Sequence, residues 1–149
     1  MENLTVRYAT HDDLDIVIKF DAMDDKRFFK LKTDPQVYEA LILQKSILLA
    51  FVGEEAIASL RWDFIWPERV PLLSWLYVVE EYRNRRIGEK LLFVARRNIR
   101  EMGYDRVLLS ACDERPEMIA MMRNNRMEEA GQIKFPDGSN EIFFWLALG

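Results

Sequence analysis

The chain has 149 residues, of which 50% are hydrophobic and 31% are charged, and its formal net charge is −4. This balance predicts one globular domain over residues 1–149 and excludes a largely disordered chain. A single cysteine excludes an internal disulfide, a single histidine excludes a histidine-rich metal site, and the net negative charge excludes a general attraction to nucleic acid.

Seven short runs have the composition of β-strands, and four segments have the apolar spacing of helices. The expected strands cover residues 4–9, 47–52, 56–64, 72–79, 107–111, 132–134 and 141–148. The expected helices begin after Thr10 and at Pro35, and two more cover residues 88–102 and 116–125. Thr10 and Asp34 are suitable N-caps, and Gly103 is a suitable residue just past a helix end.

The predicted order is therefore β-α-α-β-β-β-α-β-α-β-β. Three strands in succession favour antiparallel pairing, whereas the strand–helix–strand unit over residues 72–111 favours a parallel, right-handed crossover. The apolar run over residues 72–79 is typical of a central strand buried on both faces. We predict an α/β (α+β) fold with a mixed, mostly antiparallel central sheet of about seven strands and helices on both faces.

Charge is concentrated in one segment. Residues 83–100 contain seven basic side chains and one acidic side chain, Glu89, so this segment carries +6 and the rest of the chain −10. A positive strip on an acidic protein indicates a small anionic ligand, although a solvated helix face would have the same composition. The loop before the helix favours the ligand, because the first N–H groups of a helix lack internal partners and Gly88 leaves space for a phosphate.

The run Tyr82-Arg83-Asn84-Arg85-Arg86-Ile87-Gly88, followed by Leu91-Leu92, resembles the acetyl-CoA-binding motif of GNAT-superfamily N-acetyltransferases. That motif reads Arg/Gln-x-x-Gly-x-Gly/Ala after a central strand, and the order of elements is also similar over nearly the whole chain. Arg83 matches the first motif position and Gly88 the last. Arg86 stands where the family usually has its first glycine.

The resemblance implies that the acyl donor, acetyl-CoA, is bound mainly by backbone groups. The strand end would bind the pantetheine arm and polarise the thioester carbonyl, and the amides of residues 83–89 would bind the pyrophosphate. The cofactor-binding residues implied in this way are Tyr77, Val78, Val79, Arg83, Asn84, Arg85, Arg86, Ile87, Gly88 and Glu89.

Several side chains depart from the family pattern. Arg115 replaces a common asparagine, Met122 replaces a tyrosine that protonates the leaving thiolate, and Arg126-Met127 replaces a Gly-Phe pair. Ser110 falls where some members have a glutamate base. The resemblance therefore leaves the catalytic residues unknown.

Other candidates for proton transfer or substrate contact have ordinary alternatives. Asp63 is a candidate substrate contact, but an acid on an exposed strand face is the alternative. Glu80 and Glu81 fit a solvated loop, Cys112 fits a small buried residue better than a nucleophile, and His11 fits a helix start. Residues 12–25 contain six acidic side chains and one basic side chain, Lys19. The acidic side chains would suit the binding of a cationic amine, or they simply form a solvated helix face.

These observations predict an N-acetyltransferase that transfers an acetyl group from acetyl-CoA to a primary amine of an unidentified acceptor, by direct attack in a ternary complex. The acceptor would be a small-molecule amine or a protein amine. The first alternative is an acyl-CoA-binding or regulatory module with little or no catalysis. A second is a nucleic-acid or protein interaction domain that uses the basic strip. The net charge of −4 and the absence of interleaved aromatic residues weigh against nucleic acid.

We expect no metal and no nucleic-acid partner. We also expect no membrane partner, because the chain has no apolar run near the roughly 18 residues of a membrane span. The N-terminus lacks the features of a signal peptide, and the single cysteine fits a cytoplasmic protein. A homodimer through residues 141–148, near a sheet edge, is a further hypothesis.

Overall fold

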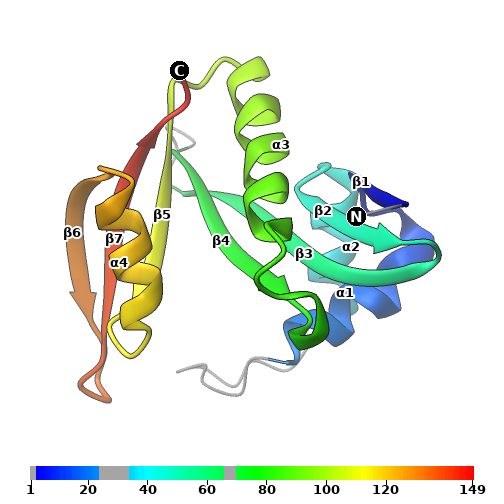
Figure 1. Cartoon of the computed structure of the whole chain (residues 1–149), viewed down its shortest axis with the longest axis horizontal. Helices are drawn as coiled ribbons and strands as arrows, with labels where there is room; N and C mark the ends of the chain where they lie inside the picture. The colour runs from blue at the N-terminus through cyan, green and yellow to red at the C-terminus, as the bar shows by residue number, and fades with distance from the viewer. Residues whose placement is uncertain (1–2, 24–33, 66–69) are drawn as a thin grey trace. The chain divides into compact units, whose positions relative to one another are not determined.

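A computed structural model describes residues 3–23, 34–65 and 70–149, and its order of elements confirms the predicted order (Figure 1). The strands are β1 Leu4–Tyr8, β2 Ile47–Val52, β3 Glu55–Ile65, β4 Val70–Val78, β5 Arg106–Cys112, β6 Glu128–Lys134 and β7 Asn140–Ala147. The helices are α1 Leu14–Asp21, α2 Pro35–Leu43, α3 Ile87–Glu101 and α4 Pro116–Asn124, with 3₁₀ turns η1 His11–Asp13 and η2 Glu80–Tyr82.

The strands form one mixed, mostly antiparallel sheet of seven strands in the order β1-β2-β3-β4-β5-β7-β6, which confirms the predicted fold class. The predicted parallel pair is β4 with β5, and its ladder consists of Leu72 with Leu108 and Leu73 with Leu109. No helix in the described parts of the chain is long and apolar enough to cross a membrane.

The chain forms two compact units, residues 1–62 with 75–95 and residues 63–74 with 96–149. In the first unit, α1 and α2 cover one face of the sheet through a buried apolar cluster that includes Val17, Phe20 and Ile47. The Tyr77 ring of β4 packs against Phe20 of α1, whereas the preceding Leu76 lies beside α3. Because neighbouring strand residues point to opposite faces, α1 and α3 lie on opposite faces of β4.

The second unit is built on the hairpin of β6 and β7, with β7 also paired to β5. Phe144 of this unit is fully buried and pairs with Leu109 in the β5–β7 ladder. Helix α4 packs against β5 and buries Ile119 and Met122. The apolar residues predicted for these elements thus form a core of their own.

Three sequence-based expectations are wrong in detail. β6 begins at Glu128 and not at Gln132, because pairing with β7 extends a strand whose seven residues are all exposed. β7 is an inner strand between β5 and β6, so the predicted dimer contact cannot use its edge. Residues 72–79 are not buried on both faces: Leu73 is buried, but Leu76 and Val78 are only partly buried, and Val78 lines a cavity.

The start of α1 is stabilised by the buried carboxylate of Asp13. It accepts hydrogen bonds from the Arg7 guanidinium at 2.7 and 3.1 Å, and from the backbone N–H and the hydroxyl of Thr10 at 2.7 and 3.1 Å. The hydrogen bonds with Arg7 are the main reason that the pKa of Asp13 is lowered from its ordinary value. The charged form of Asp13 therefore stabilises the folded chain.

We predict that Asp13→Asn lowers the free energy of unfolding by about 1–3 kcal/mol at neutral pH. The Asp13 pKa is lower in the folded chain than in the unfolded chain, so this stabilisation is complete above the unfolded value of about 4 and disappears as pH falls through the folded value. Urea unfolding of both proteins across this range measures the difference.

The matched control is Asp12→Asn, since Asp12 is exposed in the same 3₁₀ turn and should change stability by less than about 0.5 kcal/mol. A stability difference for Asp13→Asn that persists unchanged into acid would contradict the role of the charge.

Candidate anion-binding site

A cavity of about 360 Å³ lies where β4 ends and α3 begins, within the first unit. It is the segment in which the sequence predicted an anion cradle. Its lining residues are Val78, Tyr82, Arg83, Asn84, Arg86, Ile87, Gly88 and Glu89. Ile87 is buried and thereby fixes the first turn of α3 to the core, so the loop before it is held at a defined position.

Two residues of the loop adopt left-handed backbone conformations, Asn84 and Arg86, each with φ of 62°. Asparagine tolerates this conformation, but arginine rarely adopts it. Arg86, at the position where the motif usually has a glycine, therefore has a backbone conformation that glycine adopts without strain. Successive N–H groups in alternating left- and right-handed conformations form a concave nest for an anion.

The backbone hydrogen bonds show which amides are available in this nest. The amide of Arg83 donates to the Glu80 carbonyl at 3.2 Å, and the first bond into α3 runs from the Lys90 amide to the Arg86 carbonyl at 3.1 Å. Between them, none of the amides of residues 84–89 donates to a backbone carbonyl in the described parts of the chain. The amides without a backbone acceptor are thus those of residues 84–89. Of the amides of residues 83–89 that the motif implied, only that of Arg83 already has a backbone acceptor.

The end of β4 offers further backbone groups. The amide of Val79 donates to the Ile57 carbonyl of β3 at 2.9 Å. Because alternate residues of a strand direct their N–H and C=O to opposite sides, Val78 directs its groups away from β3. Of the three strand residues that the motif implied, Val78 is therefore the one with outward backbone groups, while the Tyr77 ring packs in the core.

The arginine side chains have different surroundings. The Nε atom of Arg83 donates to the Val78 carbonyl at 2.9 Å, and its Cζ atom lies 5.6 Å from the centre of the Tyr77 ring. Arg85 lies over the Tyr82 ring, 5.2 Å from its centre, and Arg86 lines the cavity. The sequence pattern does not reveal these two ring contacts or the bond to Val78.

Gly88 lies in the first turn of α3. A Cβ atom built there would meet the Leu76 side chain at 3.5 Å, which is an ordinary contact. The protein itself therefore has room for alanine at this position. A larger side chain at Gly88 would extend into the cavity that this residue lines.

The acid predicted as a substrate contact, Asp63, accepts a hydrogen bond from the Ser74 hydroxyl at 2.6 Å. Both residues belong to the second unit, whereas the cavity belongs to the first. Ser74 was not among the predicted residues. Its position opposite an acid on the neighbouring strand is visible only once the two strands are paired.

Three other candidates fit packing or solvent exposure. Met122, in the position of the usual tyrosine, is only 1% exposed and packs in the core beneath α4. Burial raises the pKa of the Cys112 thiol, which disfavours the nucleophilic thiolate. His11 is exposed in η1.

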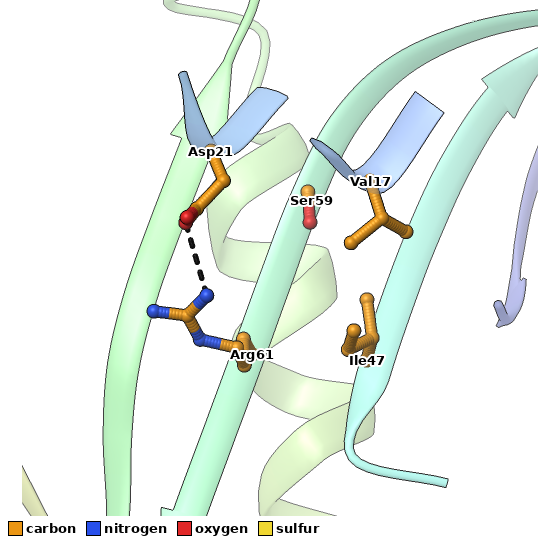
Figure 2. A pocket seen from close by; sticks show the side chains of 5 residues that line it. All are labelled: Val17, Asp21, Ile47, Ser59 and Arg61. Atoms are coloured by element: carbon orange, nitrogen blue, oxygen red, sulfur yellow. Dashed lines mark hydrogen bonds and ion pairs between the residues drawn. The ribbon is translucent and has the colours of Figure 1, made fainter. Parts of the chain in front are cut away.

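A second hollow, which has no room for a water molecule, has an ion pair in its wall (Figure 2). The buried carboxylate of Asp21 accepts hydrogen bonds from Arg61, at 2.9 Å, and from the Tyr38 hydroxyl. These contacts join α1, α2 and β3. Two acids of the predicted acidic border, Asp13 and Asp21, are therefore paired internally, and Asp24 and Asp25 lie outside the described residues.

A model of the acetyltransferase (GNAT) family matches residues 18–125. A GNAT-family acetyltransferase from Bacillus cereus has 18% identity and a TM-score of 0.71, with 97% of this chain and 96% of that chain covered. The yncA protein of Salmonella typhimurium, solved with its cofactor acetyl-CoA, has 14% identity and a TM-score of 0.81, with 99% and 95% covered. A ribosomal-protein-alanine N-acetyltransferase from Brucella melitensis has 19% identity and a TM-score of 0.80, with 96% and 99% covered. No curated protein matches the chain in sequence.

We predict that Arg86→Gly raises the free energy of unfolding of the ligand-free protein by about 1 kcal/mol, because glycine adopts the left-handed conformation without strain. Chemical denaturation measures this change. The matched control is Arg85→Gly, since Arg85 has no positive φ and should lose about 0.5–1 kcal/mol. Destabilisation of equal size in both variants would contradict strain at Arg86.

Proposed function

Because the chain belongs to the acetyltransferase (GNAT) family, we propose that it transfers an acetyl group from acetyl-CoA to a primary amine. Family membership supports acetyl transfer in general, and the choice of an amine acceptor is our proposal. The observation that carries it is the run of amides at residues 84–89 that have no backbone acceptor, beside a cavity at a helix N-terminus. Such a nest suits the diphosphate of acetyl-CoA.

We assign the donor site to the residues that the motif implied, with roles refined by their contacts. The amides of residues 84–89 bind the diphosphate, and Arg86 adds positive charge within the cavity. The Val78 carbonyl already accepts from Arg83, so the outward N–H of Val78 is the group that faces the pantetheine arm. The N–H of Val78 then polarises the thioester carbonyl as the tetrahedral intermediate forms.

The reaction is direct attack in a ternary complex. The neutral amine attacks the thioester carbon, the C–S bond breaks, the CoA thiolate leaves, and the amine nitrogen loses a proton. Asp63 stays the acceptor contact proposed from the sequence, and within the second unit its carboxylate accepts a hydrogen bond from the Ser74 hydroxyl. Water is the carrier of the proton in this scheme, since Met122 replaces the usual tyrosine and is buried.

We propose two classes of acceptor amine. Structural neighbours include the ribosomal-protein-S18-alanine N-acetyltransferase of Escherichia coli and the NatC complex bound to a Gag peptide and CoA. We therefore include peptide N-termini with small amines as acceptor classes. We further propose that residues 1–149 act as one functional domain.

The buried Met122 also favours a second candidate function, an acyl-CoA-binding module with little or no catalysis. Both functions require acetyl-CoA binding, but only the enzyme releases the CoA thiol when an amine is added. Thiol release measured with polyamines, free amino acids, lysine peptides and alanine-starting peptides separates the two. Release above the rate without protein supports the enzyme, whereas binding without release across the panel supports the module.

We predict that millimolar acetyl-CoA raises the thermal midpoint of the wild type, by about 5 °C or more at a hundredfold excess over Kd. Gly88→Glu should abolish this shift, because it introduces bulk and negative charge into the cavity. Gly88→Ala is the matched control and should keep most of the shift, since its Cβ atom meets only the Leu76 side chain at an ordinary distance. A wild type without any shift would contradict both functions.

A further inference from the structure

Arg83 is bound to the end of β4 and to the following turn at the same time. Its side-chain Nε atom donates to the Val78 carbonyl at 2.9 Å. Its backbone N–H donates to the Glu80 carbonyl at 3.2 Å. The residue immediately before the nest of free amides is therefore tied to the strand that precedes the loop.

The positive charge of Arg83 is directed to an aromatic ring. The Cζ atom lies 5.6 Å from the centre of the Tyr77 ring, within the range of a cation–π contact. Tyr77 in turn packs against Phe20, with ring centres 5.8 Å apart, and Phe20 is 4% exposed. The guanidinium thus links the loop to the apolar core of the first unit.

We propose that Arg83 is a positioning residue, which supports acetyl-CoA binding by holding the first turn of the loop against β4 and not by a charge contact with phosphate. With this bond in place, the amides of residues 84–89 already converge before the ligand arrives. A preorganised site binds more tightly because less conformational freedom is lost on binding. This inference rests on the proposed binding of acetyl-CoA.

The identity of the donor atom allows a sharp test. The Nε2 atom of glutamine is separated from Cα by the same number of bonds as the Nε atom of arginine, so Arg83→Gln keeps an N–H donor at this point without the charge. The Cε methyl of methionine stands at the same number of bonds and cannot donate. The two variants therefore differ from each other mainly in the hydrogen bond to Val78.

Calorimetric titration with acetyl-CoA at low and high salt measures the effect. Arg83→Met should bind acetyl-CoA about five- to tenfold more weakly than the wild type, because the free energy of one hydrogen bond corresponds to a change in Kd of that size. Arg83→Gln should recover most of the lost affinity. The salt dependence of Kd should be the same in all three proteins, because screening acts on charge contacts with the ligand. Arg97→Met, which removes an exposed arginine from α3 in the second unit, controls for the change in net charge.

Equal weakening in both variants, with a smaller salt dependence than in the wild type, would overturn the proposal and show that the guanidinium contacts phosphate. Wild-type affinity in Arg83→Met would overturn it as well. Hydrogen exchange of the Tyr82 amide, which donates to the Val79 carbonyl at 2.9 Å in the turn that Arg83 holds, provides a second readout in the ligand-free proteins. It should be about fivefold faster in Arg83→Met than in Arg83→Gln, and equal rates would contradict the positioning role even if acetyl-CoA does not bind.

Discussion

Two residues of the loop between β4 and α3, Asn84 and Arg86, have left-handed backbones, and for arginine this costs on the order of 1 kcal/mol. The strain is local, but it decides the direction of the neighbouring peptide groups. The amides of residues 84–89 have no backbone acceptor in the described parts of the chain. A nest of this kind favours an anion in water-accessible space, since its N–H groups lack internal partners.

The nest is supported from the apolar core of the first unit through a short series of contacts. Phe20 packs on Tyr77, Tyr77 on the Arg83 guanidinium, and Arg83 bonds to the Val78 carbonyl. On the other face of β4, Leu76 lies beside Gly88 at the start of α3. The loop is thus held from both faces of one strand, which is the physical reason why a solvent-exposed segment can have a defined shape.

Much of the fold was predictable, because apolar periodicity and helix caps are local signals. β2, Ile47–Val52, has the predicted bounds. Asp34 caps α2 as predicted, since its side chain accepts a hydrogen bond from the Gln36 amide. The start of β6 at Glu128 was not predictable, since Glu128 and Glu129 have no strand preference of their own and become part of the strand only by pairing with β7. The location of the candidate site was also predictable from its charge and Gly88. The bond between Arg83 and Val78 and the pairing of Asp63 with Ser74 were not, because they depend on neighbouring backbones in space.

The most direct measurement is a set of ¹H–¹⁵N spectra recorded during titration with acetyl-CoA and, separately, with S-acetylpantetheine, which has no diphosphate. With acetyl-CoA, the amide resonances of residues 84–89 should shift strongly, and the Arg83 amide, which already donates to the Glu80 carbonyl, should shift least among its neighbours. S-acetylpantetheine should perturb Val78 and leave the nest largely unchanged. If saturating acetyl-CoA shifts resonances elsewhere in the chain but leaves the amide resonances of residues 84–89 unchanged, the proposed binding site is contradicted.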